Sequence, residues 1–315
     1  MPCVAGVGHV ALDLVFELDA IPQQPVKVAA RALRRVVGGM TASACVAAAR
    51  LGAAVRFGSP VGDDDAAEHF AHHFAHEGVD PCGLQRVAGA QSSVSAVLVD
   101  AQGQRLVVSH HGQALRAPPP LDEAWMAQAD VVIADPRCPD WAEAALRSAR
   151  LRGVPGVLDG DVAPRADLQR LAGLAAWTVC SEPGVAALLG LAFHGALDEA
   201  TVWHGLDEVL SLGADVAVVT LGERGLWWQR RGGPPAHLAA YDPGPVVDTL
   251  GAGDAFHGAL AVALAEGQGD LAALRFASVA AALKCLRPGG IAGAPVRAEV
   301  DAHLAALARR GLALD

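Results

Sequence analysis

The residues with the clearest potential for chemistry lie in the run Asp-Thr-Leu-Gly-Ala-Gly-Asp, from Asp248 to Asp254. Gly251, Ala252 and Gly253 are too small to fill a core, but they let a backbone approach a ligand closely. The Ala- and Leu-rich stretch that follows predicts a helix, whose N-terminal N–H groups and dipole favour a phosphate or a developing anion. Asp254, in the first turn, is placed to take a proton from an attacking hydroxyl. The spacing therefore predicts a phosphotransferase acting on a carbohydrate-type alcohol, while a capping aspartate behind a Gly-rich turn is an equally common structural explanation.

The composition excludes several other classes of protein. The chain has 315 residues, 52% of them hydrophobic, and a net charge of −10 without a basic patch, which argues against a nucleic-acid partner. The six cysteines lack Cys-x-x-Cys spacing, and neither a signal peptide nor an uninterrupted membrane-spanning run is present. We therefore expect a reduced, cytoplasmic protein with no membrane partner.

Short apolar runs alternate with Ala-rich helical stretches beyond residue 130, which predicts βαβ units and a parallel sheet. Each run ends in polar residues, and the carboxyl ends of parallel strands share one edge, so we expect a composite site there. A first apolar strand from Val4 to Leu14 would bring Asp13 to the same edge. The strand ends in question are 135–137, 159–161, 181–184 and 220–225.

The run Asp-Thr-x-Gly-Ala-Gly-Asp resembles the C-terminal signature of the ribokinase-like (PfkB) carbohydrate kinases. The resemblance implies one ribokinase-like domain over residues 1–315, a three-layer α/β/α fold with a mostly parallel sheet and a small β-sheet lid. It also implies ATP and Mg²⁺ as cofactors, with Asp254 as the catalytic base and the amides of Gly251, Ala252 and Gly253 as the anion hole. No Walker A sequence occurs, so a P-loop kinase is not expected.

The same resemblance assigns the sugar site and the lid. Residues 14–37 and 91–112 alternate like strands and would form the lid, through which members of the family often pair as homodimers. Asp13 inherits a role in binding sugar hydroxyls. Gly38, Gly39 and Ser43 lie in a segment similar to the family's Gly-Gly-x-Gly-x-Asn, although Thr41 and Ser43 replace the third Gly and the Asn.

Other positions match the nucleotide and metal sites of the family. Glu182 is a weak candidate for holding Mg²⁺ through water, and Asp248 lies where some members hold a monovalent cation, K⁺ for example. The residues that the resemblance places near the nucleotide are Thr220, Gly222, Gly225, Ala280, Lys284 and Gly289.

A finer resemblance, over almost the whole chain, is to the bacterial 6-deoxy-6-sulfofructose kinases within this family. It rests on segments such as Val157-Leu-Asp-Gly-Asp161 and Phe256-His-Gly-Ala-Leu. It implies that Lys27 and Arg137 bind a sulfonate, because guanidinium and ammonium groups suit such an anion, and that Ser109 lies at a substrate-binding position of the lid. Ser109 replaces an Asn, so phosphorylation of an unmodified ketohexose or ribose stays open. A nucleoside or vitamin kinase and a catalytically silent binding protein are the remaining alternatives.

Overall fold

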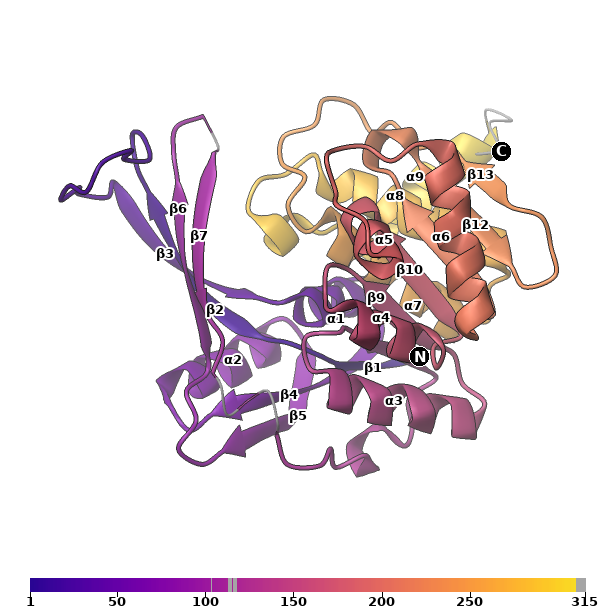
Figure 1. The fold of residues 1–315 in the computed structure, drawn as a ribbon, viewed down its shortest axis with the longest axis horizontal. Helices are drawn as coiled ribbons and strands as arrows, with labels where there is room; N and C mark the ends of the chain where they lie inside the picture. Colours follow the sequence, from indigo (N-terminus) through magenta and orange to yellow (C-terminus); the bar gives the residue numbers. More distant parts are fainter. Residues whose placement is uncertain (103, 113–114, 116–117, 310–315) are drawn as a thin grey trace.

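The computed structural model describes residues 1–102, 104–112, 115 and 118–309, and Gly103, within the predicted lid segment 91–112, lies outside the described residues. Most of the chain forms a nine-stranded sheet between two layers of helices, and a four-stranded sheet projects from one side (Figure 1). This three-layer α/β/α arrangement with a small β-sheet lid is the one that the sequence predicts.

The large sheet has the strand order β13-β12-β11-β10-β9-β8-β1-β4-β5. Strands β1, β4, β5 and β8 to β11 pair in parallel, whereas β12 runs in the opposite direction and pairs antiparallel with both β11 and β13. The carboxyl ends of the parallel strands therefore meet at one edge, which confirms the expected arrangement. The strands are β1 (Cys3–Val7), β4 (Ala54–Gly62), β5 (Val79–Val87), β8 (Val131–Ala134), β9 (Gly156–Gly160), β10 (Trp177–Ser181), β11 (Val216–Thr220), β12 (Leu226–Arg230) and β13 (Ala236–Leu238).

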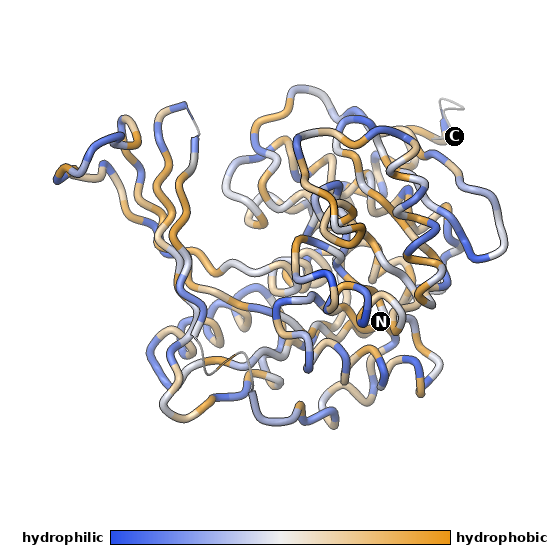
Figure 2. Tube along the Cα trace, viewed as in Figure 1, coloured by the Kyte–Doolittle hydropathy of each residue, from blue (hydrophilic) through white to orange (hydrophobic). Residues whose placement is uncertain are grey.

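Both faces of this sheet are covered, because its central strands are apolar on both sides (Figure 2). On one face, Val4, Ile133 and Val179 pack with α1, α2, α7, α8 and α9. On the other face, Ala5, Leu158 and Val219 contact the buried sides of α3 to α6. The helices are α1 (Met40–Arg50), α2 (Asp65–His76), α3 (Pro139–Arg152), α4 (Arg165–Ala172), α5 (Glu182–Leu189), α6 (Glu199–Leu212), α7 (Ala252–Ala265), α8 (Asp270–Lys284) and α9 (Arg297–Arg309).

The lid sheet has the order β3-β2-β6-β7, built from β2 (Ala11–Glu17), β3 (Ala32–Gly38), β6 (Ser93–Val99) and β7 (Arg105–His110). The prediction of a single strand from Val4 to Leu14 was wrong. The chain leaves the large sheet after β1 and enters the lid as β2, so Asp13 lies within a lid strand and not at the end of a strand of the large sheet. Hydrophobic content does not reveal this break, since both strands are apolar.

Among the residues described, no helix is long and apolar enough to cross a bilayer.

Candidate active site

Helix α7 begins at the small residues of the signature, at the carboxyl edge of the sheet. Gly251 is its N-cap with φ +78°, and a Cβ there would lie 3.0 Å from the Ile291 nitrogen, so both the conformation and the space favour glycine. Within the described chain, the N–H groups of Gly251 and Gly253 find no acceptor, whereas Ala252 N–H donates to the Thr249 carbonyl at 3.2 Å. Two of the three amides of the predicted anion hole are therefore available to a ligand.

Asp254 lies in the first turn of α7 and is partly exposed. Burial and the nearby Asp159 carboxylate raise its pKa to about 8, against the opposing effects of His257 and of a hydrogen bond from Ser43. Ser43, on α1, is thus brought to Asp254 as part of one site. A carboxyl group with a pKa near neutrality is suited to exchange a proton with a bound hydroxyl.

His257 lies one turn after Asp254 and is buried. Its Nδ1–H donates to the Gly253 carbonyl at 2.8 Å, and Nδ1 is 3.6 Å from Asp159 Oδ2. Burial lowers the pKa of His257, although the hydrogen bond to the Gly253 carbonyl and the Asp254 and Asp161 carboxylates oppose the shift, and this favours the neutral ring. No role for His257 was predicted from the sequence, because its neighbour Asp159 is distant in the chain.

Two further carboxyl groups lie where β9 ends, beside the end of β10. Asp159 is near the end of β9, and Asp161 directly follows this strand. Burial, with Asp161 and Asp135, raises the pKa of Asp159 well above its ordinary value. Asp161 accepts a hydrogen bond from Ser181 Oγ at 3.0 Å. These two carboxyl groups provide the oxygen ligands that Mg²⁺ prefers, usually one or two carboxylates beside substrate phosphates.

Asp135 directly follows β8, and its carboxylate accepts hydrogen bonds from three backbone N–H groups at this edge of the sheet. Its Oδ2 accepts N–H groups of His9 (3.0 Å) and Thr41 (3.3 Å), and its Oδ1 accepts the Arg137 N–H at 3.0 Å. A Cβ at Gly8 would lie 2.0 Å from Oδ2, so the glycine makes room for the carboxylate. Asp135 therefore holds the start of α1 and the loop of Arg137 in fixed positions.

Arg137 itself is exposed, and its side chain makes no ion pair or hydrogen bond within the described chain. Its positive charge nevertheless acts on two groups of the site. It adds to the lowering of the pKa of His9 that burial causes, and it opposes the upward shift in the pKa of Asp159. The predicted substrate residue is thus near the site and available to an anion.

The lid contributes a polar row across three neighbouring strands. Asp13, Ser95 and Ser109 are paired in register, and the two serine Oγ atoms are 3.2 Å apart. Burial raises the pKa of Asp13, although a hydrogen bond from Ser95 opposes the shift. A Cβ at Gly38 would lie 2.4 Å from Asp13 Oδ2, so Gly38 makes room for this carboxylate. Asp13 and Ser109 were predicted from the sequence, whereas Ser95 was missed.

Gly39 supports the site through space and not through a ligand contact. It has φ +121°, and a Cβ there would lie 2.1 Å from the His9 carbonyl. The loop after β1, which contains His9, can approach the start of α1 only if residue 39 lacks a side chain.

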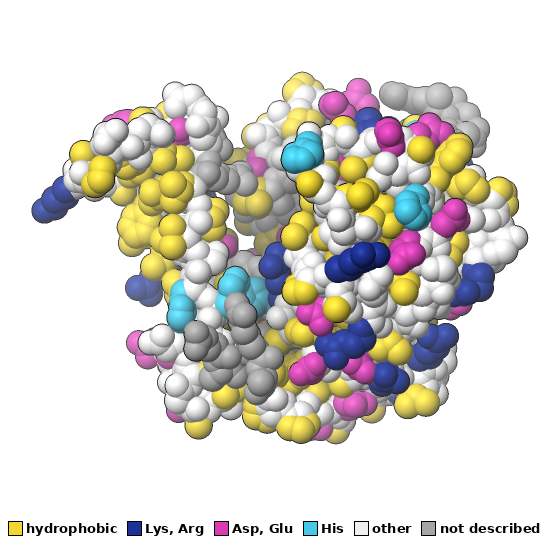
Figure 3. Space-filling view, viewed as in Figure 1, with side chains coloured by type: hydrophobic (Ala, Val, Ile, Leu, Met, Phe, Trp, Pro, Cys, Tyr) yellow, Lys and Arg dark blue, Asp and Glu magenta, His cyan; other side chains and the backbone are white. Residues whose placement is uncertain are grey.

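Lys27 is exposed and belongs to the loop between β2 and β3. This loop forms the far tip of the lid (Figure 1), and a gap separates the lid from part of the body (Figure 3). The loop of Lys27 is therefore not brought to the end of β8, which Arg137 follows, in this conformation.

Thr220, Gly222 and Gly225 lie in the turn between β11 and β12. Thr220 Oγ1 donates to the Cys180 carbonyl at 3.4 Å. Gly222 and Gly225 have φ +59° and +82°, and a Cβ at Gly225 would lie 2.1 Å from the Leu238 carbonyl. The turn leaves Gly222 exposed at the carboxyl edge, where the resemblance places a nucleotide.

Two of the residues that the resemblance places near the nucleotide are buried in this structure. Ala280 lies in the core, and Lys284 is 0% exposed, with its ammonium group against Asp248. Gly289 is exposed, and its N–H donates to Asp248 Oδ2 at 3.0 Å. The side chains of Ala280 and Lys284 therefore contact protein atoms here.

The two predicted metal residues are also engaged by protein groups. Glu182 Oε1 accepts from the Leu197 N–H at 2.7 Å and pairs with Arg224. Asp248 accepts three backbone N–H groups and lies beside Lys284. No metal role was predicted from the sequence for Asp159 and Asp161, whose carboxyl groups lie close enough to Asp254 to raise its pKa.

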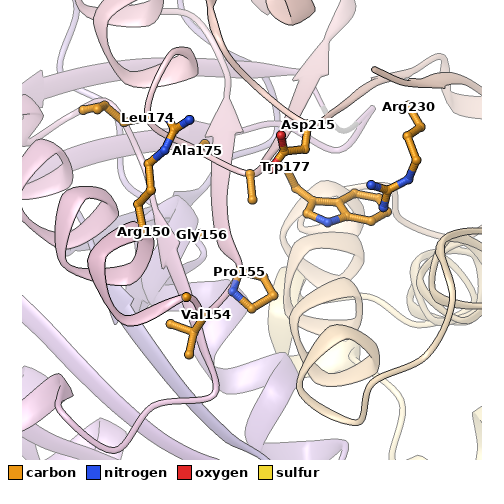
Figure 4. Close-up of a pocket in the computed structure, with 11 residues that line it drawn as sticks. Arg150, Val154, Pro155, Gly156, Leu174, Ala175, Trp177, Asp215 and Arg230 are labelled. Atoms are coloured by element: carbon orange, nitrogen blue, oxygen red, sulfur yellow. The ribbon is translucent and has the colours of Figure 1, made fainter. Parts of the chain in front are cut away.

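A separate cavity of about 340 Å³ lies at the opposite edge of the sheet (Figure 4). The cavity lies at the amino ends of β9 and β10, and the residues that line it include Arg150, Trp177 and Arg230. Arg150 donates to the Gly173 carbonyl, and Arg230 pairs with Asp270. This cavity is distinct from the candidate active site.

Comparison with known proteins agrees with this geometry. The family model described as pfkB family carbohydrate kinase matches residues 1–297, so the chain belongs to the PfkB carbohydrate kinases, phosphotransferases with an alcohol acceptor. The ribokinase of Bacillus subtilis is 29% identical over 94% of this chain and 97% of its own length. An ATP-dependent ribose-1-phosphate kinase of Halopiger xanaduensis is 30% identical over 96% and 97%.

Solved structures give the same family. A candidate ribokinase from Agrobacterium tumefaciens superposes with a TM-score of 0.88 at 33% identity, over 98% of this chain and 99% of that one. The Arabidopsis thaliana ribokinase, solved with ribose and ATP, shares the fold with a TM-score of 0.84 at 23% identity, over 96% and 98%. These four relatives are named as ribose or ribose-phosphate kinases and not as sulfofructose kinases.

Proposed function

We propose that this chain is an ATP-dependent kinase whose acceptor is a hydroxyl of an unmodified sugar, ribose or a ketohexose. The observation that carries the proposal is Asp254, whose weakly acidic carboxyl lies directly behind the free amides of Gly251 and Gly253. Proton acceptor and anion-binding amides therefore belong to the same helical turn. The names of the ribokinase relatives support a sugar as the substrate.

In the proposed mechanism, the polar row of Asp13 and the two lid serines binds sugar hydroxyls. Asp254 accepts the proton of the attacking hydroxyl, while the N–H groups at the start of α7 stabilise charge on the transferred phosphoryl group. ATP supplies that phosphoryl group, and Asp159 and Asp161 are the residues that would hold its Mg²⁺. A lid made from residues 14–37 and 91–112 would exclude water when closed.

A second acceptor, 6-deoxy-6-sulfofructose, is favoured by one specific observation. Arg137 is a cation near the sugar site that has no side-chain partner in the described residues. Arginine binds planar or tetrahedral oxyanions with two parallel hydrogen bonds. Lys27 would contribute only after a movement of the lid, because its loop between β2 and β3 lies at the tip of the lid in this conformation.

The test is direct measurement of ADP formation with ribose, fructose and 6-deoxy-6-sulfofructose, in the wild type and in Arg137→Ala. An unmodified sugar as substrate predicts the highest kcat/KM for ribose or fructose and little change in the variant. A sulfonate substrate predicts that Arg137→Ala lowers kcat/KM for sulfofructose about 10- to 100-fold, as expected for a lost charge-assisted hydrogen bond. Arg147→Ala, at an exposed pair with Glu143 on α3, is the matched control. ATP turnover with none of the sugars would refute the kinase proposal.

We further propose that the lid pairs with the lid of a second copy. One face of the lid carries the polar row, and the opposite face carries Leu33, Leu106 and Val108, which are 55%, 42% and 61% exposed. Hydrophobic side chains gather on the lid in Figure 3. Contiguous exposed apolar surface of this kind is typical of an interface.

A further inference from the structure

Lys284, the last residue of α8, has an unusual environment for a lysine. Its side chain is completely buried, and Nζ donates to the Asp248 carbonyl oxygen at 2.7 Å. The same nitrogen is 3.5 Å from Asp248 Oδ2. A buried ammonium group is tolerated only when oxygen atoms replace its water, and Asp248 provides two of them.

Asp248 in turn holds the segment that leads into the anion-binding turn. Its carboxylate accepts the Leu250 N–H at 3.0 Å and the N–H groups of Gly289 and Gly290 at 3.0 and 3.1 Å. The Asp248 N–H donates to the Cys285 carbonyl, immediately after Lys284. The ammonium group, the carboxylate and these amides therefore connect the end of α8 to the start of α7.

These contacts bear on the monovalent cation expected at Asp248. A cation such as K⁺ would need carbonyl and carboxylate oxygens, and the Lys284 ammonium already contacts both kinds on this residue. A second positive charge at the same oxygens would be repelled. The residues present therefore do not fit an additional monovalent cation on these two atoms.

We propose that the Lys284 ammonium group is a built-in cation that positions Asp248 and the turn at Gly251, so that this kinase needs no K⁺. The functional part of this inference rests on the proposed role of the α7 amides in phosphoryl transfer. The structural part, a fixed charge in place of an exchangeable one, concerns folding and cation binding alone. Lys284 acts here as a positioning residue and touches no substrate.

The first experiment measures the thermal midpoint of the purified full chain in KCl, NaCl and tetramethylammonium chloride at equal ionic strength. The wild type is expected to unfold at the same temperature in all three salts. Lys284→Ala leaves a space and two oxygens without a cation, so it is expected to unfold at a lower temperature and to recover part of the loss in KCl only. Lys284→Met, which fills the space without charge, is expected to lose stability without recovery. Arg147→Ala is the control for the loss of a surface charge.

The second experiment measures ADP formation directly, because coupling enzymes can have their own cation requirements. Wild-type turnover with the best sugar is expected to change less than about twofold between the salts. Turnover of Lys284→Ala is expected to fall about tenfold or more and to recover in part with K⁺.

Specific stabilisation or activation of the wild type by K⁺ would overturn the proposal. A folded Lys284→Ala that responds to no small cation would also overturn it, by reducing Lys284 to a packing role. If Lys284→Ala does not fold, the wild-type and Lys284→Met measurements still decide. Because the thermal experiment needs no sugar, it remains informative even if the proposed kinase activity is not found.

Discussion

Asp254 is the residue on which the proposed chemistry depends most directly. Replacing it by Asn keeps the shape of the side chain and its contact with Ser43 but removes the proton acceptor. Turnover should fall by about 10²- to 10⁴-fold, the usual contribution of a general base. Steady-state kinetics with saturating ATP and sugar test this, and near-normal turnover would exclude Asp254 from that role.

The same substitution should stabilise the protein at high pH. The pKa of Asp254 is raised from an ordinary aspartate value to about 8 on folding, so ionisation costs stability as the pH rises toward and through 8. Asn cannot ionise, and Asp254→Asn should therefore unfold a few degrees above the wild type near pH 9 and show little difference near pH 4. Thermal unfolding at the two pH values measures the effect, and a lower midpoint for the variant near pH 9 would contradict it.

The neighbouring Asp159 should set the pH range of activity. Its negative charge raises the pKa of Asp254, so Asp159→Asn should lower that pKa and shift the acidic limb of the pH profile of kcat/KM to lower pH. Activity in both proteins should rise with pH, because the base acts when deprotonated. An unchanged limb in Asp159→Asn would mean that another group controls it.

The site residues that could be predicted from the sequence are those that belong to one local motif. Asp254, Gly251 and Gly253 stand together in the chain and form one helical turn. Asp135 meets its partner His9 from 126 positions away, and Ser95 joins Asp13 only through strand pairing. Such contacts depend on the order of the strands, which the sequence pattern did not reveal.

At the scale of the elements, helices α1 and α7, which carry Ser43 and Asp254, pack closely against each other at Gly258. A Cβ at Gly258 on α7 would lie 2.3 Å from the Ala44 carbonyl on α1, the helix that carries Ser43. Gly258→Ala should push the two helices apart and lower the free energy of unfolding by about 1–3 kcal/mol. Because Ser43 and Asp254 would separate, turnover should also fall.

Denaturant titration and kinetics of Gly258→Ala measure both effects, with Gly269→Ala as the control. Gly269 precedes α8, and a Cβ there meets nothing within 4 Å. An equal loss of stability in both variants, or no loss in Gly258→Ala, would show that the contact between the helices is not the cause.

The elements differ in how well the sequence predicts them. The apolar runs after residue 130 became β8 to β11 as predicted, because buried parallel strands are apolar on both faces. The first strand was predicted as one element because β1 and β2 are equally apolar, although they belong to different sheets. The burial of Lys284 could not be predicted from the sequence either, since a lysine at a helix end ordinarily faces water.

For the whole molecule, the lid determines the expected assembly. Charge on its apolar face should prevent pairing, so Leu33→Glu and Val108→Glu should convert a dimer to a monomer in light scattering, with the same thermal midpoint for the body. Glu223→Gln, an exposed residue in the turn after β11, is the control. If the wild type is monomeric at all concentrations tested, the proposed pairing of lids is refuted.

The order of strands in the large sheet has a consequence for biosynthesis. Strand β1 is made before the other strands of the sheet, but it lies inside the sheet, between β4 and β8, and β8 ends at Ala134. Strand β1 therefore cannot have a neighbour on both sides until residue 134 has been made. Asp248, which precedes α7, accepts the N–H groups of Gly289 and Gly290, so the site is complete only after residue 290 has been made. Until β8 is made, the nascent chain would expose one edge of an apolar strand, and such an intermediate is prone to aggregate or to bind chaperones.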